Sequence, residues 1–410
     1  KRFVENAEDL GTRVIYDGDW DGTFKIGWTD NPAWILYDLL TSQRYGIGNT
    51  IDNLEDINIF NLYKIGRYCD AVDGNGNFVG LSNGLLGLEP RYSCNIMLDV
   101  SANAFESIKD ISSVFNGMAF WANGALDFFT DQPKEPMMFF SNGNVFDGMF
   151  NYQSTNKSSL FNVADVAYAD KRDNFAVKTE SVIDEEGMRK NGLQRRVVTA
   201  KGATSRSQAR RLGKYILYSN KLEREIVNFK TSAEALMVSI GDIIEIQDEL
   251  KNFNISYAKA IEIGTNYITL ENGPSASSIL NNNSGISVIV PTGQDTLNEL
   301  HDYTLSGGLI GEQELHEFYT PQVKKLKITG VLDLDDKIKI QIEDPSGYLP
   351  YVQTGSFVNL DLENRNIKQY RVLTLTPEQD NLYSISATEH NKEKFDLIEA
   401  EDNFALDEVE

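Results

Sequence analysis

The sequence predicts an α+β protein that is mainly β and is built from several domains. Helices alternate with short antiparallel strands over the first 165 residues, and from about Val163 onward short strands with regularly spaced turns dominate. Such a run of short strands favours barrels or a sandwich over a doubly wound parallel sheet. The chain has 410 residues, 41% of them apolar, which suffices for two or three domains that each bury a core.

The first predicted helix begins at a recognisable cap. Asn31 suits the N-cap and Pro32 suits the first helical position, and the apolar stretch Ala33 to Leu40 follows directly. Gly46 and Gly48 are typical residues for the end of a helix. We therefore expect this helix to end near those two glycines.

Three more elements and a loop are predicted before residue 118. Residues 54–72 carry apolar side chains at helical spacing, which predicts a second helix. The glycine-rich residues 73–87 predict a loop. Residues 91–100 predict a strand. A third helix is expected over 102–117, with Ser101 as its N-cap and a closing glycine at its end.

Residues 118–130 give the clearest local signal in the chain. Aromatic and apolar residues flank the dipeptide Asn123-Gly124 on both sides. That pattern is typical of a β-hairpin with a tight type I′ turn.

The second part of the chain is predicted to be strands around one helix, over residues 205–219, capped by Ser205. Polar residues 274–319 predict a strand pair set among long loops. The predicted strands are 163–169, 174–183, 222–231, 241–248, a hairpin over 257–273, 323–331, 337–344, 370–376 and 382–390. The expected domains are a mixed α+β domain at 1–165, a β-rich domain at 166–272, a loopy β insertion or barrel part at 273–355, and terminal strands at 356–410.

Charge and composition exclude several classes of function. A net charge of −23 opposes a dominant contact to phosphate backbones, so specific nucleic-acid binding is not expected. No apolar run is long enough to span a bilayer. The two cysteines, Cys69 and Cys94, are too few for a disulfide framework, although a single bridge stays open.

One basic stretch, residues 189–214, stands out from the acidic background. Few aromatic residues interleave with its arginines, so a solvated helix face or a contact to an acidic neighbouring subunit is favoured over a nucleic-acid groove. The interaction candidates are Arg195, Arg196, Arg206, Arg210 and Arg211.

An Asp/Gly turn near the start is the only candidate metal site. Asp17, Asp19 and Asp21 match the first half of a calcium-binding EF-hand loop. The ninth position of that loop is Lys25 and the twelfth is Trp28, where the motif needs oxygen ligands. A solvated turn between strands is therefore the favoured interpretation, and no cofactor is expected.

No catalytic set is predicted. Ser82 satisfies the string G-x-S-x-G but lacks the strand and helix that a nucleophile elbow requires. His301, His316 and His390 lie far apart on polar segments and are expected at the surface. The acidic group Asp333, Asp335 and Asp336 has nothing in the sequence to position it.

Longer motifs carry a family resemblance over nearly the whole chain. In order they are WDGTF (20–24), NPAWILYDLLT (31–41), RYGIG (44–48), IGRYCD (65–70), EPRYSCNIML (89–98), DKRDNFAV (170–177), TSRSQARRLGKYIL (204–217), GDIIEIQD (241–248) and the stretch from Tyr370 to Glu399. With these motifs the sequence resembles the tail-tip host-specificity proteins of lambda-like siphophages, the protein J or central tail hub family.

The resemblance implies a role as well as a fold. It implies a homotrimeric hub of β-barrel-like domains at the virion tail tip, assembled in the host cytoplasm, that closes the distal end of the tail tube. Implied partners are distal tail proteins, the tail tube or tape-measure protein, and a host receptor reached through an extension that this chain lacks. The chain is then expected to be the hub body of a longer protein.

The same resemblance interprets the Asp/Gly turn and the net charge. The turn becomes a structural corner that places Trp20 and Phe24 in the core beside Trp34. Part of the negative charge is expected to line a channel for DNA, where repulsion keeps phosphates from binding.

Two other classes of function remain as alternatives. One is a tail-associated hydrolase, which would need a positioned catalytic set. The other is a stand-alone carbohydrate- or receptor-binding protein, in which Trp28 or Tyr348 could stack on sugars.

Overall fold

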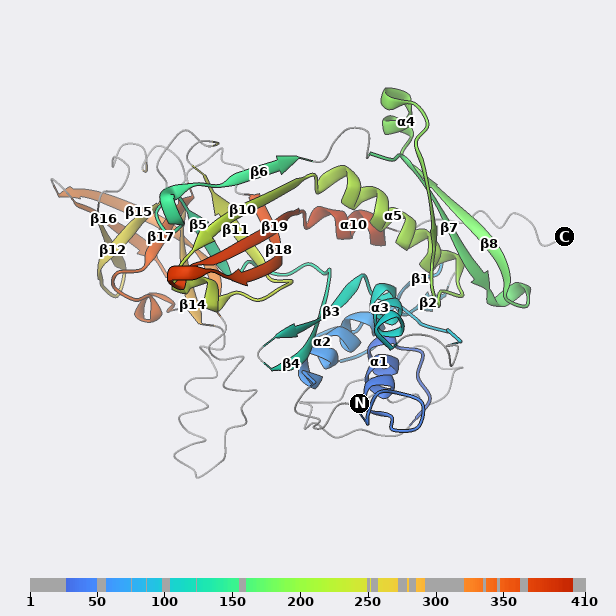
Figure 1. Ribbon diagram of the computed structural model, residues 1–410. Coiled ribbons are helices and arrows are strands. Elements are labelled where there is room, and N and C mark those ends of the chain that lie inside the picture. The colour runs from blue at the N-terminus through green and yellow to red at the C-terminus, as the bar shows by residue number, and fades with distance from the viewer. Residues whose placement is uncertain are drawn as a thin grey trace. The chain divides into compact units, whose positions relative to one another are not determined.

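The computed structural model divides into two compact units (Figure 1). Unit one comprises residues 1–133, 156–222 and 392–410, and unit two comprises residues 134–155 and 223–391, so the chain passes between them four times. The structure describes residues 27–49, 57–74, 76–85, 87–97, 104–122, 124–154, 160–248, 251, 257–271, 279, 285–291, 321–334, 337–344, 347–361 and 368–400.

Unit one combines helices with short sheets. Its elements are α1 (Pro32–Thr41), α2 (Ile59–Asp70), β1 (Leu81–Ser82), β2 (Leu88–Glu89), α3 (Ala104–Val114), β3 (Gly117–Ala122), β4 (Ala125–Thr130), β7 (Val163–Asp170), β8 (Ala176–Ile183), α4 (Glu185–Asn191), β9 (Arg195–Thr199), α5 (Arg206–Leu222) and α10 (Glu393–Glu399). Strands β3 and β4 form a hairpin, and β8, β7 and β9 form a three-stranded sheet in that order.

Helix α1 confirms its predicted start. The side chain of Asn31 accepts a hydrogen bond of 3.0 Å from the backbone N–H two residues later, and Pro32 is the first helical residue. The helix ends at Thr41, earlier than expected. Gly46 and Gly48 lie in the turn behind it, where an added Cβ would meet helix carbonyls at 1.9 and 2.2 Å.

One apolar core joins α1, α2, α3 and the β3–β4 hairpin. Its fully buried side chains are Leu36, Leu40, Leu62, Ile65, Ile111, Phe115 and Phe128. The hairpin prediction is confirmed: Ala122 pairs with Ala125, and Gly124 turns the chain at φ +82°. Helix α3 is followed by Asn116 at φ +51°, and Gly117 already belongs to β3 rather than closing the helix.

The strand predicted over residues 91–100 is wrong for the described residues 91–97. Their backbone groups bond to three different segments, because Tyr92 N–H donates to Cys69, Cys94 N–H to Asp30 and Asn95 N–H to Gly202. A strand requires one continuous partner, and this segment instead connects three parts of unit one.

Unit two contains a six-stranded sheet with the order β5-β11-β18-β19-β10-β6. These strands are β5 (Met138–Ser141), β6 (Asn151–Ser154), β10 (Glu225–Thr231), β11 (Ile243–Gln247), β18 (Lys368–Pro377) and β19 (Tyr383–His390). Its apolar core includes Phe140 and Phe229, whose ring centroids lie 4.9 Å apart.

Unit two also contains a closed six-stranded barrel, whose strands are labelled in Figure 1. Its strands are β12 (Tyr257–Ile263), β13 (Tyr267–Glu271), β16 (Lys337–Glu343), β15 (Pro321–Leu334), β14 (Gly285–Pro291) and β17 (Phe357–Asp361). Alternate side chains fill the interior, among them Ile268, Ile286, Ile340 and Leu360. The barrel confirms the mainly β, barrel-containing fold class.

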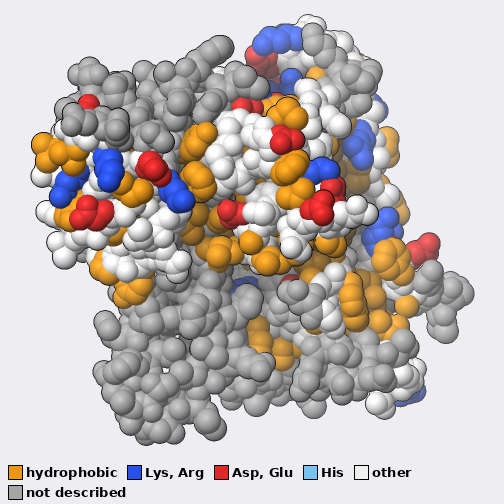
Figure 2. Space-filling view, turned by 60° about the vertical axis from the view of Figure 1, so that its left-hand side comes forward, with side chains coloured by type: hydrophobic (Ala, Val, Ile, Leu, Met, Phe, Trp, Pro, Cys, Tyr) orange, Lys and Arg blue, Asp and Glu red, His pale blue; other side chains and the backbone are white. Residues whose placement is uncertain are grey.

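The elements that the sequence did not predict are short or depend on distant partners. They are β1, β2, β5, β6, β9, β17, α4 and α10. The four-domain division stays a prediction, since the described residues group by contact and not by chain order. In Figure 2 the basic and acidic side chains on the visible face are interspersed.

Truncating the barrel core should destabilise unit two. Ile340 is fully buried between Ile268 and Val331, so Ile340→Ala leaves a cavity and should cost about 2–5 kcal/mol of unfolding free energy. Urea denaturation measures this loss. Lys337→Ala, at an exposed position of the same strand, is the matched control and should change little; an equal loss in both variants would contradict the packing argument.

Candidate functional site

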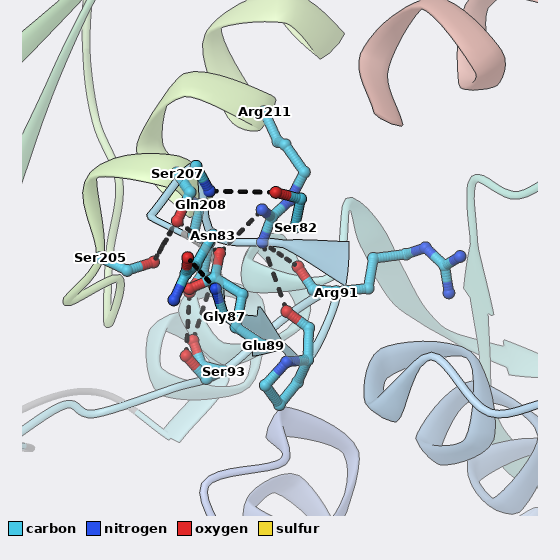
Figure 3. Close-up of polar contacts among 12 residues, drawn as sticks. Ser82, Asn83, Gly87, Glu89, Arg91, Ser93, Ser205, Ser207, Gln208 and Arg211 are labelled. Atoms are coloured by element: carbon cyan, nitrogen blue, oxygen red, sulfur yellow. Dashed lines mark hydrogen bonds and ion pairs between the residues drawn. The ribbon is translucent and has the colours of Figure 1, made fainter. Parts of the chain in front are cut away.

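Helix α5 carries the basic stretch that the sequence singles out, and its first turn is fixed by a cap. Ser205 Oγ accepts a hydrogen bond of 3.2 Å from Gln208 N–H, which confirms the predicted cap. The capped end presents polar side chains to the hairpin of β1 and β2 and to the segment after it (Figure 3).

Glu89 is the anionic centre of this contact. Ser207 Oγ donates to Glu89 Oε1 at 2.6 Å, and the guanidinium of Arg211 lies 2.8 Å from the same oxygen. Arg211 also donates to the backbone carbonyls of Pro90 and Arg91 at 3.3 and 3.2 Å. A buried charge needs such a set of partners, so Arg211 is a structural residue of unit one.

A reciprocal amide contact extends the network (Figure 3). Ser93 Oγ donates to Gln208 Oε1, and Gln208 Nε2 donates to the Ser93 carbonyl, both at 2.9 Å. Within the hairpin, Asn83 Oδ1 accepts from the N–H groups of Leu85 and Gly87. These bonds hold the non-regular segment 90–95 against α5.

Three other arginines of the stretch, Arg195, Arg206 and Arg210, pair with carboxylates on the β8-β7-β9 sheet. Arg206 Nε and Arg210 Nη1 lie 2.8 and 2.9 Å from the two oxygens of Glu180, whose side chain is buried. Arg195 lies 3.1 Å from Asp165. The sheet and the helix are therefore tied by ion pairs within one chain.

A buried ion pair fixes α10 against α5. Lys394 Nζ lies 2.6 Å from Asp131 Oδ2, and the two side chains are 0% and 1% exposed. Tyr215 OH donates to the same oxygen at 2.8 Å, and Ser219 Oγ lies 3.5 Å from the ammonium group. Two charges this deeply buried are tolerated only together.

A second ion pair holds the end of α10. Arg91 reaches both oxygens of Glu399, at 2.6 and 3.2 Å, and stacks 4.1 Å from the centroid of the Tyr68 ring. Burial lowers the pKa of Arg91, but the hydrogen bond and charge of Glu399 outweigh it and raise that pKa above its usual value. Lys214 Nζ donates to the carbonyl of Ala400, just after the helix, at 3.0 Å.

The side chains around α5 and α10 leave no pocket large enough for a substrate among the described residues. The hollow beside Arg91, Tyr92 and Tyr215 is too small for an organic ligand. Among the described residues, no group of three or more His, Cys, Asp or Glu side chains could hold a metal ion. Nor is any helix in that part of the chain long and apolar enough to cross a membrane.

Only some of the predicted site residues lie in the part of the chain that the structure describes. Asp17, Asp19 and Asp21 lie outside the described residues, as do Trp20, Phe24, His301 and His316. All five interaction candidates are described, with Arg196 stacked 5.1 Å from the Phe161 ring centroid. Arg211 is buried, so it is not part of a solvated helix face.

Two further expectations are tested by burial. His390 is 4% exposed, so the expectation of a surface histidine is wrong there; it ends β19, an interior strand of the sheet, with Nδ1 3.7 Å from Glu223. Trp34 is buried, as expected. Ser82 lies on a two-residue strand and accepts only a local bond from Gly84 N–H in the part of the chain described.

Sequence reasoning missed the carboxylates and the lysine that complete the network. Glu89, Glu180, Asp131 and Lys394 lie far in sequence from their partners on α5. The spacing of Arg206 and Arg210, four residues apart, places both on one helix face and could have indicated a shared acceptor. Phe395 and Ile398, three residues apart, could have indicated α10.

Comparison with known proteins points to phage tails. Residues 103–261 match the family model described as "Putative phage tail protein". The tip attachment protein J of Escherichia phage SECphi27 is 32% identical over 393 residues, 94% of this chain and 29% of the relative. The tip attachment protein J of Escherichia phage SECphi4 is 34% identical over 238 residues, 57% of this chain and 20% of the relative. The chain thus spans less than a third of either relative.

Two solved structures align with this chain at low identity. A protein of the native gene transfer agent virion covers 66% of this chain and 46% of its own, with 10% identity and a TM-score of 0.33. A tail protein from Neisseria meningitidis MC58 covers 65% and 62%, with 7% identity and a TM-score of 0.29.

Breaking the buried pair should destabilise unit one strongly. Lys394→Met leaves Asp131 buried without its counter-charge, and Asp131→Leu does the converse, so each should cost about 3–5 kcal/mol. The double variant should recover much of that loss, as a double-mutant cycle by thermal or urea unfolding measures. The control Lys190→Met breaks an exposed pair with Glu186 and should have no measurable effect. Additive losses in the double variant would contradict the coupling.

Both thiols should be unreactive in the folded chain. Cys69 and Cys94 are buried thiols outside any disulfide, and burial, with a smaller contribution from Asp30, raises the pKa of Cys94 to about 12. At pH 8 the thiol therefore stays protonated and shielded, and a thiol reagent such as DTNB should titrate both cysteines only after unfolding. Rapid reaction of one thiol in the native protein would refute this.

Proposed function

We propose that this chain, a J-like phage tail-tip protein by its sequence kinship, is a structural component of the tail tip. The observation that carries the proposal is the match to a tip attachment protein over 94% of the chain. A location in the tail of the virion follows from the same kinship.

The geometry around α5 is in keeping with a structural role. Arg206, Arg210 and Arg211 bind carboxylates of their own chain, and α10 is held by ion pairs near both ends. These charges stabilise the unit and leave no positioned nucleophile, base or metal centre among the residues described. We therefore propose that the chain acts by assembly and not as an enzyme.

The finer assignment is a hub. Three copies would surround the tail axis, close the distal end of the tube and carry the host-recognition extension. Distal tail proteins and the tube or tape-measure protein would be the neighbours, the host receptor would be reached through the extension, and assembly would take place in the host cytoplasm. The motifs shared with the protein J family support this assignment.

Immunogold electron microscopy of the source phage tests the proposal. Antibody raised against this chain should label only the distal end of the tail. Particles without the antigen, or preimmune serum, serve as the control. Label on capsids, or on free protein alone, would reject a tail-tip role and bring the receptor- or carbohydrate-binding alternative forward.

A further inference from the structure

The two faces of the β8-β7-β9 sheet differ in what covers them. Helix α5 covers one face: Gly213 lies so close that an added Cβ would meet Val182 at 2.6 Å and Val166 at 3.3 Å. Ala209 of the helix packs with Val166 and Tyr168 in the same core. Figure 1 shows α5 lying along the β7–β8 ribbon.

The opposite face consists of the alternate residues, and we call it the outer face. Register pairs Val177 with Ala169, Thr179 with Ala167, Ser181 with Asp165 and Ile183 with Val163, while Val197 and Thr199 of β9 lie beside Asp165 and Ala167. Successive side chains of a strand point to opposite faces, so this set points away from α5.

The outer face exposes apolar side chains on β8 and β9, whereas Val163 and Asp165 on the central strand β7 are buried. Val177 is 78% exposed, Val197 71% and Ile183 51%, a concentration of exposed β-branched side chains on one small sheet. Exposed apolar residues gathered on one face are typical of an interaction surface, whereas single ones are ordinary. The central charge is neutralised, since Asp165 pairs with Arg195 at 3.1 Å and accepts from Ser181 Oγ at 2.5 Å.

Charge selects the occupant of this face. Residues 163–201 carry eight basic and seven acidic side chains, and the other parts of the chain carry thirty basic and fifty-four acidic ones. A basic partner would be drawn to the acidic remainder, whereas a second copy of this acidic chain would be repelled there. A ring of three copies joins two different surfaces, so the outer face would meet another part of the next chain. Because the sheet has almost no net charge, it is the place where an acidic second copy is repelled least.

We infer that the outer face of the β8-β7-β9 sheet contacts a second copy of this chain. The inference rests on the proposed hub, to which it assigns a contact surface between copies. It also moves that contact away from Arg206, Arg210 and Arg211, because those side chains are bound to Glu180 and Glu89 of their own chain.

Photo-crosslinking in assembled phage tests this surface. The photoreactive residue p-benzoylphenylalanine replaces Val177 or Val197 in the full-length protein, with Trp121 as the control because it is 65% exposed on β3, outside this sheet. Irradiation should give a product of twice the mass of the full-length chain from positions 177 and 197, in several-fold higher yield than from position 121.

Each other outcome overturns the inference. A product with a different protein, no product, or equal yields from all three positions would show that the outer face does not meet a second copy. Gold label at the tail tip together with any of these results would leave the proposed function standing. Label away from the tip would reject the function itself.

Discussion

Closure of unit one depends on the ion pair between Lys394 and Asp131. Asp131 stands just before the chain first leaves unit one, and Lys394 stands just after its last return. Neither charge is tolerable in the interior alone. The segment before the first passage to unit two and the segment after the last return must therefore meet in one geometry. Apolar residues could supply similar stability, but removing one partner of the ion pair leaves a buried charge without its counter-charge.

Helix α5 makes this arrangement possible because it has two kinds of surface. Small and apolar residues, Ala209, Gly213 and Leu217, face the sheet at close range. Ser207, Gln208 and Arg211 bind Glu89 at the end of β2 and the non-regular segment 90–93 that follows it. Most basic side chains of the stretch therefore pair with carboxylates of their own chain, although Arg195 and Arg206 stay more than half exposed.

Local signals in the sequence predicted the elements that depend on local chemistry. The caps at Asn31 and Ser205 and the tight turn at Gly124 need only neighbouring residues, and they are where expected. The segment 91–97 failed because its hydrogen-bond partners are far away in sequence. For the same reason the sequence predicted only the basic half of the site. Its arginines are clustered in the sequence, whereas Glu89 and Glu180 become their partners only when the fold brings these carboxylates to α5.

The four passages of the chain between the units have a consequence for synthesis on the ribosome. Asp131 emerges early, but its counter-charge emerges only after some 260 further residues. Until then unit one lacks its last helix and holds a carboxylate that it cannot bury. Its core should therefore mature only after translation of residue 400, although most of its helices are translated before unit two is complete.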